Sequence, residues 1–184
     1  GKPLRGAVEK RREGCVARMA RGTGQSRRTW IESSTRSAAA CRRTGALLIA
    51  DEVQCGLGRT GRPFYSGALG LTPDLMAIGK ALGAGVPIGA ALFSEKVAAA
   101  AKPGDHGSTY GGNLLACRAA LCFLGELTEG GLIDHVRRVG RFFEQRLREV
   151  AARHAIVKDV RGAGLIWGLE LSQDATPVVP AGLA

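Results

Sequence analysis

The chain has 184 residues, of which 45% are hydrophobic, and it carries a formal net charge of +10. This length and composition are typical of a soluble domain with a substantial core, and no apolar run approaches the ~20 residues that a membrane helix needs. The charge is local, because residues 1–45 contain 12 Lys and Arg against 3 Asp and Glu, whereas residues 46–184 contain 14 against 13. A nearly neutral protein with a basic front end does not favour nucleic acid as the partner.

The first 40 residues form an atypical basic segment without hydrophobic periodicity. Residues 1–40 contain few branched aliphatic side chains, so they bury too little apolar surface to offset the entropy of ordering. We expect this segment to be disordered or to be translated out of frame, with a solvated tail or a nucleic-acid-binding arm as the alternatives. The five cysteines of the chain show no Cys-x-x-Cys spacing, which predicts reduced thiols and a cytoplasmic protein.

After this segment, apolar runs alternate with helical patterns. Short continuous apolar runs predict buried strands, and apolar residues at three- and four-residue steps predict amphipathic helices. The predicted strands are residues 46–50, 74–78, 87–93, 156–160 and 165–171. The predicted helices are residues 94–101, 114–127 (capped by Asn113) and 132–153. This order indicates an α/β layer with parallel strands, followed by an α+β segment.

The run "LLIADEVQCGLGRTG" places two carboxylates, Asp51 and Glu52, directly after a buried strand. Ligands of open α/β sheets lie beyond the carboxyl ends of the strands, so Asp51 needs a cationic partner there. Magnesium in a nucleotide triphosphatase is one candidate, but it requires a G-x-x-x-x-G-K-[ST] loop. The Gly-Lys at residues 79–80 has Asp74 and Ala81 at the required positions, which excludes that loop in this chain. No His, Cys and carboxylate cluster has metal-ligand spacing either.

The protonated ring nitrogen of pyridoxal 5'-phosphate (PLP) is the second candidate partner of Asp51. A buried carboxylate keeps such a nitrogen cationic, which the cofactor needs in order to accept electrons. A PLP enzyme also needs a lysine to bind the cofactor aldehyde. Lys80 meets that need, because it follows the predicted strand 74–78 and lies in "GKALGAGVPIGA", where small residues let a flat cofactor approach the backbone.

Four segments, in this order, resemble the class III PLP-dependent aminotransferases: "LLIADEVQCGLGRTG", "PDLMAIGKALGAGVPIGA", "HGSTYGGNLLAC" and "VRGAGLIWGLEL". The resemblance covers about Cys41 to Val179. It implies an α/β fold, as part of a fold-type-I large domain with a mostly parallel sheet and helices, plus the start of an α+β C-terminal small domain. Residues 41–127 would belong to the PLP-binding large domain, and residues 128–184 to a long connecting helix and a truncated small domain.

The resemblance also implies roles for the residues of the first two segments. Asp51 would pair with the pyridine nitrogen, Val53 would pack on a ring face, and Gln54 would hydrogen-bond the ring hydroxyl. Glu52 is assigned with them to the cofactor-binding set. Lys80 would bind the cofactor aldehyde and then move the proton between the two substrate carbons.

The last two segments would supply the remaining contacts. Thr109 would bind the cofactor phosphate of the opposite subunit in a homodimer, and Ser108 would approach the substrate. Arg161 would hold the α-carboxylate of the amino or oxo acid, a task suited to a forked guanidinium.

Within the family, the motifs are most similar to members that transfer the terminal amino group of N2-acetylornithine to 2-oxoglutarate in arginine biosynthesis. Ornithine, succinylornithine and 4-aminobutyrate are the alternative donors. Family members carry upstream a phosphate-binding loop, an aromatic that stacks on the ring and a second substrate arginine, none of which can be identified in residues 1–40. We therefore expect a fragment of such an enzyme, and an inactive frameshifted remnant is the rival hypothesis.

Overall fold

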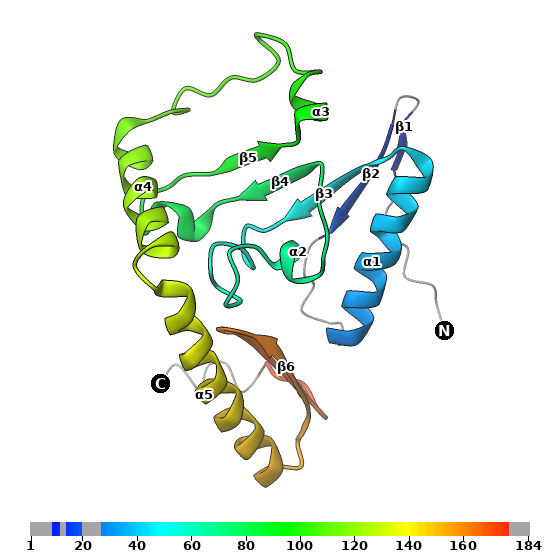
Figure 1. Ribbon diagram of the computed structural model, residues 1–184. Coiled ribbons are helices and arrows are strands. Elements are labelled where there is room, and N and C mark those ends of the chain that lie inside the picture. Colours follow the sequence, from blue (N-terminus) through cyan, green and yellow to red (C-terminus); the bar gives the residue numbers. More distant parts are fainter. Residues whose placement is uncertain (1–8, 12–13, 20–26, 177–184) are drawn as a thin grey trace.

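The computed structural model describes residues 9–11, 14–19 and 27–176, with side chains from residue 34 onward (Figure 1). One mixed sheet has the order β1-β2-β3-β4-β5, in which β2, β3 and β4 are parallel and the two outer strands are antiparallel to their neighbours. The strands are β1 Glu9–Arg11, β2 Gly14–Met19, β3 Leu47–Asp51, β4 Leu75–Ile78 and β5 Ala90–Phe93. The predicted α/β class with a mostly parallel sheet is confirmed.

The direction of β5 differs from the prediction of parallel strands. Only residues 79–89 separate β4 from β5, and their one regular element is the short 3-10 helix η1, Lys80–Gly83. A parallel return needs a crossover of about a dozen residues or more, usually with a full helix. The chain therefore turns back, and β5 pairs antiparallel with β4.

Helix α1, Arg27–Thr44, is the second difference from the prediction, because it lies largely within the segment expected to be disordered. Its buried face carries Ser34, Ala38 and Cys41. The last two pack with Leu48 of β3 and with Leu71 in one core cluster. The sequence did not reveal this helix because its buried face is made of small residues rather than branched aliphatics. The strands β1 and β2 also fall within residues 1–40, while residues 1–8, 12–13 and 20–26 lie outside the described part.

The predicted helices after the sheet are present. They are α3 Glu95–Ala98, α4 Leu114–Thr128 and α5 Leu132–Arg153, preceded in the chain by the short α2 Tyr65–Ala68. Asn113 caps α4 as expected, since its side-chain oxygen accepts a hydrogen bond from the backbone N–H of Ala116 at 3.1 Å. In the described helices no segment is long and apolar enough to cross a membrane.

A second core cluster joins the sheet to α4. Leu57 of the loop after β3, Ile78 at the end of β4 and Leu82 of η1 pack against Ala120 and Leu127 of α4. The cluster fixes the loop after β3 and the segment after β4 against one helix. Both segments emerge from the same edge of the sheet.

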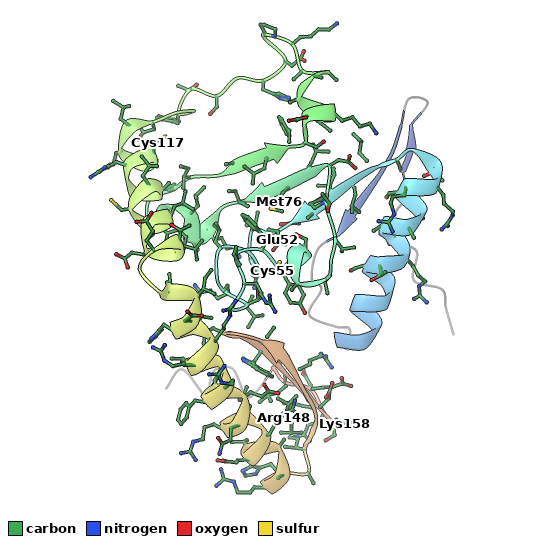
Figure 2. The ribbon with its side chains drawn as sticks, in the orientation of Figure 1. Glu52, Cys55, Met76, Cys117, Arg148 and Lys158 are labelled. Atoms are coloured by element: carbon green, nitrogen blue, oxygen red, sulfur yellow. The ribbon has the colours of Figure 1, made fainter. Side chains whose placement is uncertain are left out.

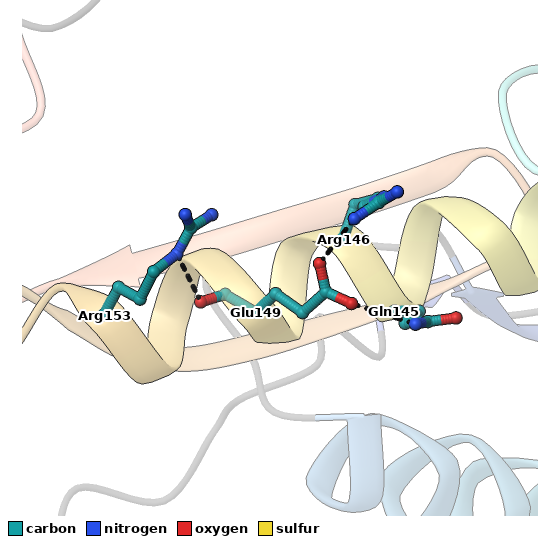
Figure 3. Close-up of polar contacts among 4 residues, drawn as sticks. All are labelled: Gln145, Arg146, Glu149 and Arg153. Carbon is teal, nitrogen blue, oxygen red and sulfur yellow. Dashed lines mark hydrogen bonds and ion pairs between the residues drawn. The ribbon is translucent and has the colours of Figure 1, made fainter.

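Helix α5 leads away from the sheet and runs beside a two-stranded antiparallel hairpin, β6 Val157–Ala163 and β7 Ile166–Leu171 (Figure 1). Its outer face is polar: Glu149 accepts hydrogen bonds from Arg146 and Gln145, and Arg153 donates to the Glu149 carbonyl (Figure 3). These contacts are exposed and contribute little to stability. Its inner face includes Gly140, where an added Cβ would lie 2.7 Å from the carbonyl oxygen of Gly164 in the hairpin turn.

Candidate active site

The carboxyl ends of β3 and β4 bring Asp51 and Lys80 to one edge of the sheet. Asp51 is the last residue of β3 and lies opposite Ala77 in the parallel register with β4. Lys80 follows two residues after β4 ends at Ile78. Parallel strands end at a common edge, so both functional groups leave the sheet on the same side, as a shared ligand would require.

Gln54 and Val53 connect these two groups. The Lys80 Nζ donates to Oε1 of Gln54 at 3.4 Å, and Oδ1 of Asp51 accepts from the backbone N–H of Val53 at 3.2 Å. The turn after β3 therefore places an amine, an amide and a carboxylate next to an apolar Val53 side chain. An amine to bind an aldehyde, an anion for a ring nitrogen and an apolar ring contact form the donor set that PLP needs.

Lys80 has an unusual backbone conformation. Its φ is +44°, a region that non-glycine residues seldom occupy. Such strain persists only where surrounding contacts hold it, and it is concentrated at functional sites. The neighbouring Gly79 brings the backbone close to the loop after β3, because a Cβ there would lie 3.8 Å from Cγ1 of Val53 and 3.5 Å from the carbonyl oxygen of Ile88.

A cleft of about 410 Å³ opens between this edge and the turn of the β6–β7 hairpin. Three of the predicted site residues line it: Val53, Gln54 and Lys80. The other lining residues are Gly56, Arg59, Ala81, Leu165, Ile166 and Trp167. The cleft thus has a polar end at Lys80 and Gln54 and an apolar wall from the hairpin.

The side chain of Glu52 does not face this cleft, which corrects its assignment to the cofactor-binding set. Glu52 is 2% exposed, and its carboxylate accepts hydrogen bonds from the backbone N–H groups of Tyr65 and Ser66 at 3.1 and 2.6 Å. It also accepts one from the Cys55 thiol at 3.1 Å. Successive residues of an extended chain point to opposite faces, so the carboxylate after Asp51 is directed into the protein instead.

Arg161 lies on β6 and does not belong to the residues that line the cleft. Its guanidinium is 14% exposed and donates to Glu170 at 2.5 Å and to Asp159 at 3.2 Å. The hydrogen bond to Glu170 chiefly raises the pKa of Arg161 above its usual value, with Asp159 adding to the effect. A substrate carboxylate would have to replace one of these two acidic partners.

Ser108 and Thr109 lie in the exposed loop between α3 and α4, and neither lines the cleft. The exposed apolar side chains nearest in sequence are Tyr110, Leu114 and Leu115. The structure therefore places Thr109 among exposed apolar residues and apart from the Lys80 cleft of its own chain.

Sequence reasoning missed two large side chains of the cleft. Arg59 was quoted within the first motif and Trp167 within the last, but neither was assigned a role. The Trp167 indole N–H donates to the carbonyl oxygen of Gly164 at 2.7 Å, which folds the ring over the hairpin turn. The available signal was the position of both residues inside the two motifs that meet at the cleft.

Comparison with known proteins bears on this geometry. Residues 29–183 match the family model described as aminotransferase class-III. The chain belongs to the class III aminotransferase family. The match begins at residue 29, so it includes most of helix α1.

Individual relatives agree with this membership. Acetylornithine aminotransferase of Methanothermobacter thermautotrophicus is 45% identical over 140 residues, covering 76% of this chain and 36% of that protein. Ornithine δ-aminotransferase of Plasmodium falciparum has a TM-score of 0.70 and 38% identity, covering 77% of this chain and 37% of that one. An amine transaminase from an uncultivated Pseudomonas species, solved with PLP bound, has a TM-score of 0.76 and 34% identity, covering 88% and 38%. The chain thus spans little more than a third of the length of the proteins it matches.

Proposed function

We propose that the protein containing this chain is a PLP-dependent transaminase and that its cofactor lies in the Lys80 cleft. The observation that carries the proposal is the arrangement at the sheet edge. Asp51 and Lys80 follow neighbouring parallel strands, and Val53 and Gln54 contact one of them each. Family membership independently supports this chemistry.

Each residue of the cleft would have a defined task. PLP, when bound, supplies an electron sink for charge that develops on the substrate carbon. The Asp51 carboxylate would hold the proton on the ring nitrogen, because a nearby anion favours the cationic form. Val53 would pack on the ring and Gln54 would hydrogen-bond its hydroxyl. Lys80 Nζ would bind the aldehyde carbon at rest and, once displaced by the substrate amine, would remove the proton from the carbon that carries that amine.

We further propose that the amino donor is N2-acetylornithine and the acceptor 2-oxoglutarate, within arginine biosynthesis. The similarity to acetylornithine aminotransferases supports this choice, while the similarity to ornithine δ-aminotransferase keeps ornithine as the second candidate. Arg161 would bind the α-carboxylate after releasing Glu170 or Asp159, and Ser108 would approach the same substrate. Turnover of each donor with 2-oxoglutarate, followed by glutamate formation, distinguishes the two candidates.

A homodimer is the proposed assembly, with Thr109 of each subunit binding the cofactor phosphate of the other. Exposed apolar side chains support an interface here. They come from β5, the loop that carries Thr109 and α4, and are Leu92, Phe93, Tyr110, Leu114, Leu115 and Leu121. We place the enzyme in the cytoplasm, with residues 41–127 in the PLP-binding domain and residues 128–184 as the connecting helix and start of the small domain.

Covalent mapping tests the proposed cofactor site. The protein is incubated with PLP, reduced with borohydride and digested, and the peptides are analysed by mass spectrometry. We expect the pyridoxyl group on Lys80, no label in Lys80→Ala, and full labelling in the exposed-lysine control Lys96→Ala. Absence of a specific label from the wild-type protein would favour the inactive remnant instead.

A further inference from the structure

We propose that Glu52 is a positioning residue that seats the β6–β7 hairpin against the loop after β3. Through this contact, Glu52 sets where Arg161 lies relative to the Lys80 cleft. The part that concerns Arg161 rests on the proposed function. The seating of the hairpin itself depends only on the contacts of the protein.

Glu52 is the largest fully buried side chain among the described residues, although it is a carboxylate (Figure 2). Both of its oxygens accept hydrogen bonds: Oε1 from the backbone N–H of Ser66, and Oε2 from the backbone N–H of Tyr65 and from the Cys55 thiol. Hydrogen bonds to an ionised acceptor are the strong ones in a protein interior. Glu52 therefore ties the start of the loop after β3 to the first residues of α2, 13 and 14 positions further along the chain.

The residues that Glu52 holds are the ones on which the hairpin packs. Cys55 and Tyr65 form a buried cluster, and Ala163 and Ile166 of the hairpin pack against it. Figure 2 shows Glu52 and Cys55 between the five-stranded sheet and the hairpin. The carboxylate thus fixes the surface that receives the hairpin, two residues from Arg161 on β6.

Backbone contacts complete this seat. The backbone N–H of Leu165 donates to the carbonyl oxygen of Arg59 at 2.9 Å, and Thr60 Oγ1 donates to the carbonyl oxygen of Cys55 at 3.2 Å. The same loop carries Val53 and Gln54 into the cleft. One strand end therefore serves both halves of the site: Asp51 faces the cofactor side, and Glu52 faces the hairpin side.

Loss of the anion should loosen the loop and the hairpin together. In Glu52→Gln the amide nitrogen replaces one carboxylate oxygen, so at least one of the two buried N–H donors loses its acceptor. An unsatisfied buried donor is costly enough to speed local opening by about tenfold or more. We expect this increase in the amide hydrogen exchange of residues 53–66 and also of residues 163–167.

The test is hydrogen exchange with mass spectrometry on the cofactor-free chain. Leu71→Val is the matched control, because Leu71 belongs to the separate cluster around Ala38 and Leu48 and should leave residues 163–167 unchanged relative to the rest of the protein. Cys55→Ala is the second variant. It keeps both backbone donors to Glu52 but removes the sulfur that contacts the hairpin, so residues 163–167 should exchange faster while the Tyr65 and Ser66 amides stay protected.

Unchanged exchange at residues 163–167 in both Glu52→Gln and Cys55→Ala would overturn the proposal, as would an equal increase in Leu71→Val. For the PLP-loaded enzyme, Glu52→Gln should raise KM for 2-oxoglutarate severalfold while labelling of Lys80 persists. Should the wild-type chain show no turnover, the proposed function fails, but the exchange result still decides the positioning role.

Discussion

Replacement of Gly164 by alanine should separate the hairpin turn from the loop after β3. Gly164 has a φ of +55°, and a Cβ added there would lie 2.5 Å from the carbonyl carbon of Thr60 and 2.6 Å from the carbonyl oxygen of Arg59. These are backbone atoms, so no side-chain rotation relieves the overlap. The opposite side is also occupied, because Gly140 of α5 lies against the same turn.

The expected cost has two parts. The left-handed backbone conformation costs an alanine about 1–2 kcal/mol relative to glycine. Overpacking against a rigid neighbour adds about 1–3 kcal/mol. The free energy of unfolding should therefore fall by about 2–5 kcal/mol in Gly164→Ala, and each kcal/mol lowers Tm by about 2–4 °C for a chain of this size.

Gly45→Ala provides a control with the same kind of backbone strain. Gly45 has a φ of +72° and nothing within 4 Å of an added Cβ, so only the conformational cost applies. Urea unfolding followed by circular dichroism measures both variants. Gly164→Ala should lose about 1–3 kcal/mol more than Gly45→Ala. Equal losses would refute the inference that the turn abuts the loop through backbone atoms.

Three further outcomes are expected. Asn113→Ala should lower the free energy of unfolding by about 1 kcal/mol through loss of the α4 cap, and Asn113→Asp should retain most of it; an unchanged urea midpoint in the alanine variant would contradict the capping role. The pKa of Glu149 lies below its usual value chiefly because Arg146 donates a hydrogen bond to it, so this stabilisation is present above the ordinary pKa and is lost as pH falls through the lowered one. NMR titration of Arg146→Gln should show the Glu149 midpoint moving upward, and a fixed midpoint would show that the contact is absent in solution. Leu114→Glu should convert the proposed homodimer to a monomer in analytical ultracentrifugation, whereas Leu169→Glu on the hairpin should not; a dimer that survives Leu114→Glu would place the interface elsewhere.

Strong periodicity made parts of the fold predictable. The pattern over residues 132–153 predicted α5 with the bounds it has, because long branched and aromatic side chains repeat at helical spacing. Helix α1 was missed because Ser34, Ala38 and Cys41 carry little hydrophobic signal, and its burial depends on contacts with β3 that are distant in sequence. The direction of β5 followed from the shortness of the preceding connection, a constraint already visible in the sequence.

The site was predictable where it depended on the order of strands and motifs. Lys80, Val53 and Gln54 line the cleft because they follow the ends of neighbouring strands. Arg59 and Trp167 were missed because their approach depends on how the hairpin docks, which no local pattern encodes. Glu52 was wrongly grouped with Asp51, although the alternation of side chains along an extended chain predicts opposite directions for the two carboxylates.

The protonation of the cofactor ring nitrogen decides whether Asp51 and Lys80 serve one molecule. We would record the NMR signal of PLP labelled with ¹⁵N in the ring, bound to the wild-type protein and to Asp51→Asn, with attachment to Lys80 verified by borohydride labelling in both. The ring nitrogen should be protonated in the wild-type protein and neutral in Asp51→Asn, since only the carboxylate favours the cation. A ring nitrogen that is protonated to the same extent in both proteins would show that Asp51 does not face the cofactor held by Lys80.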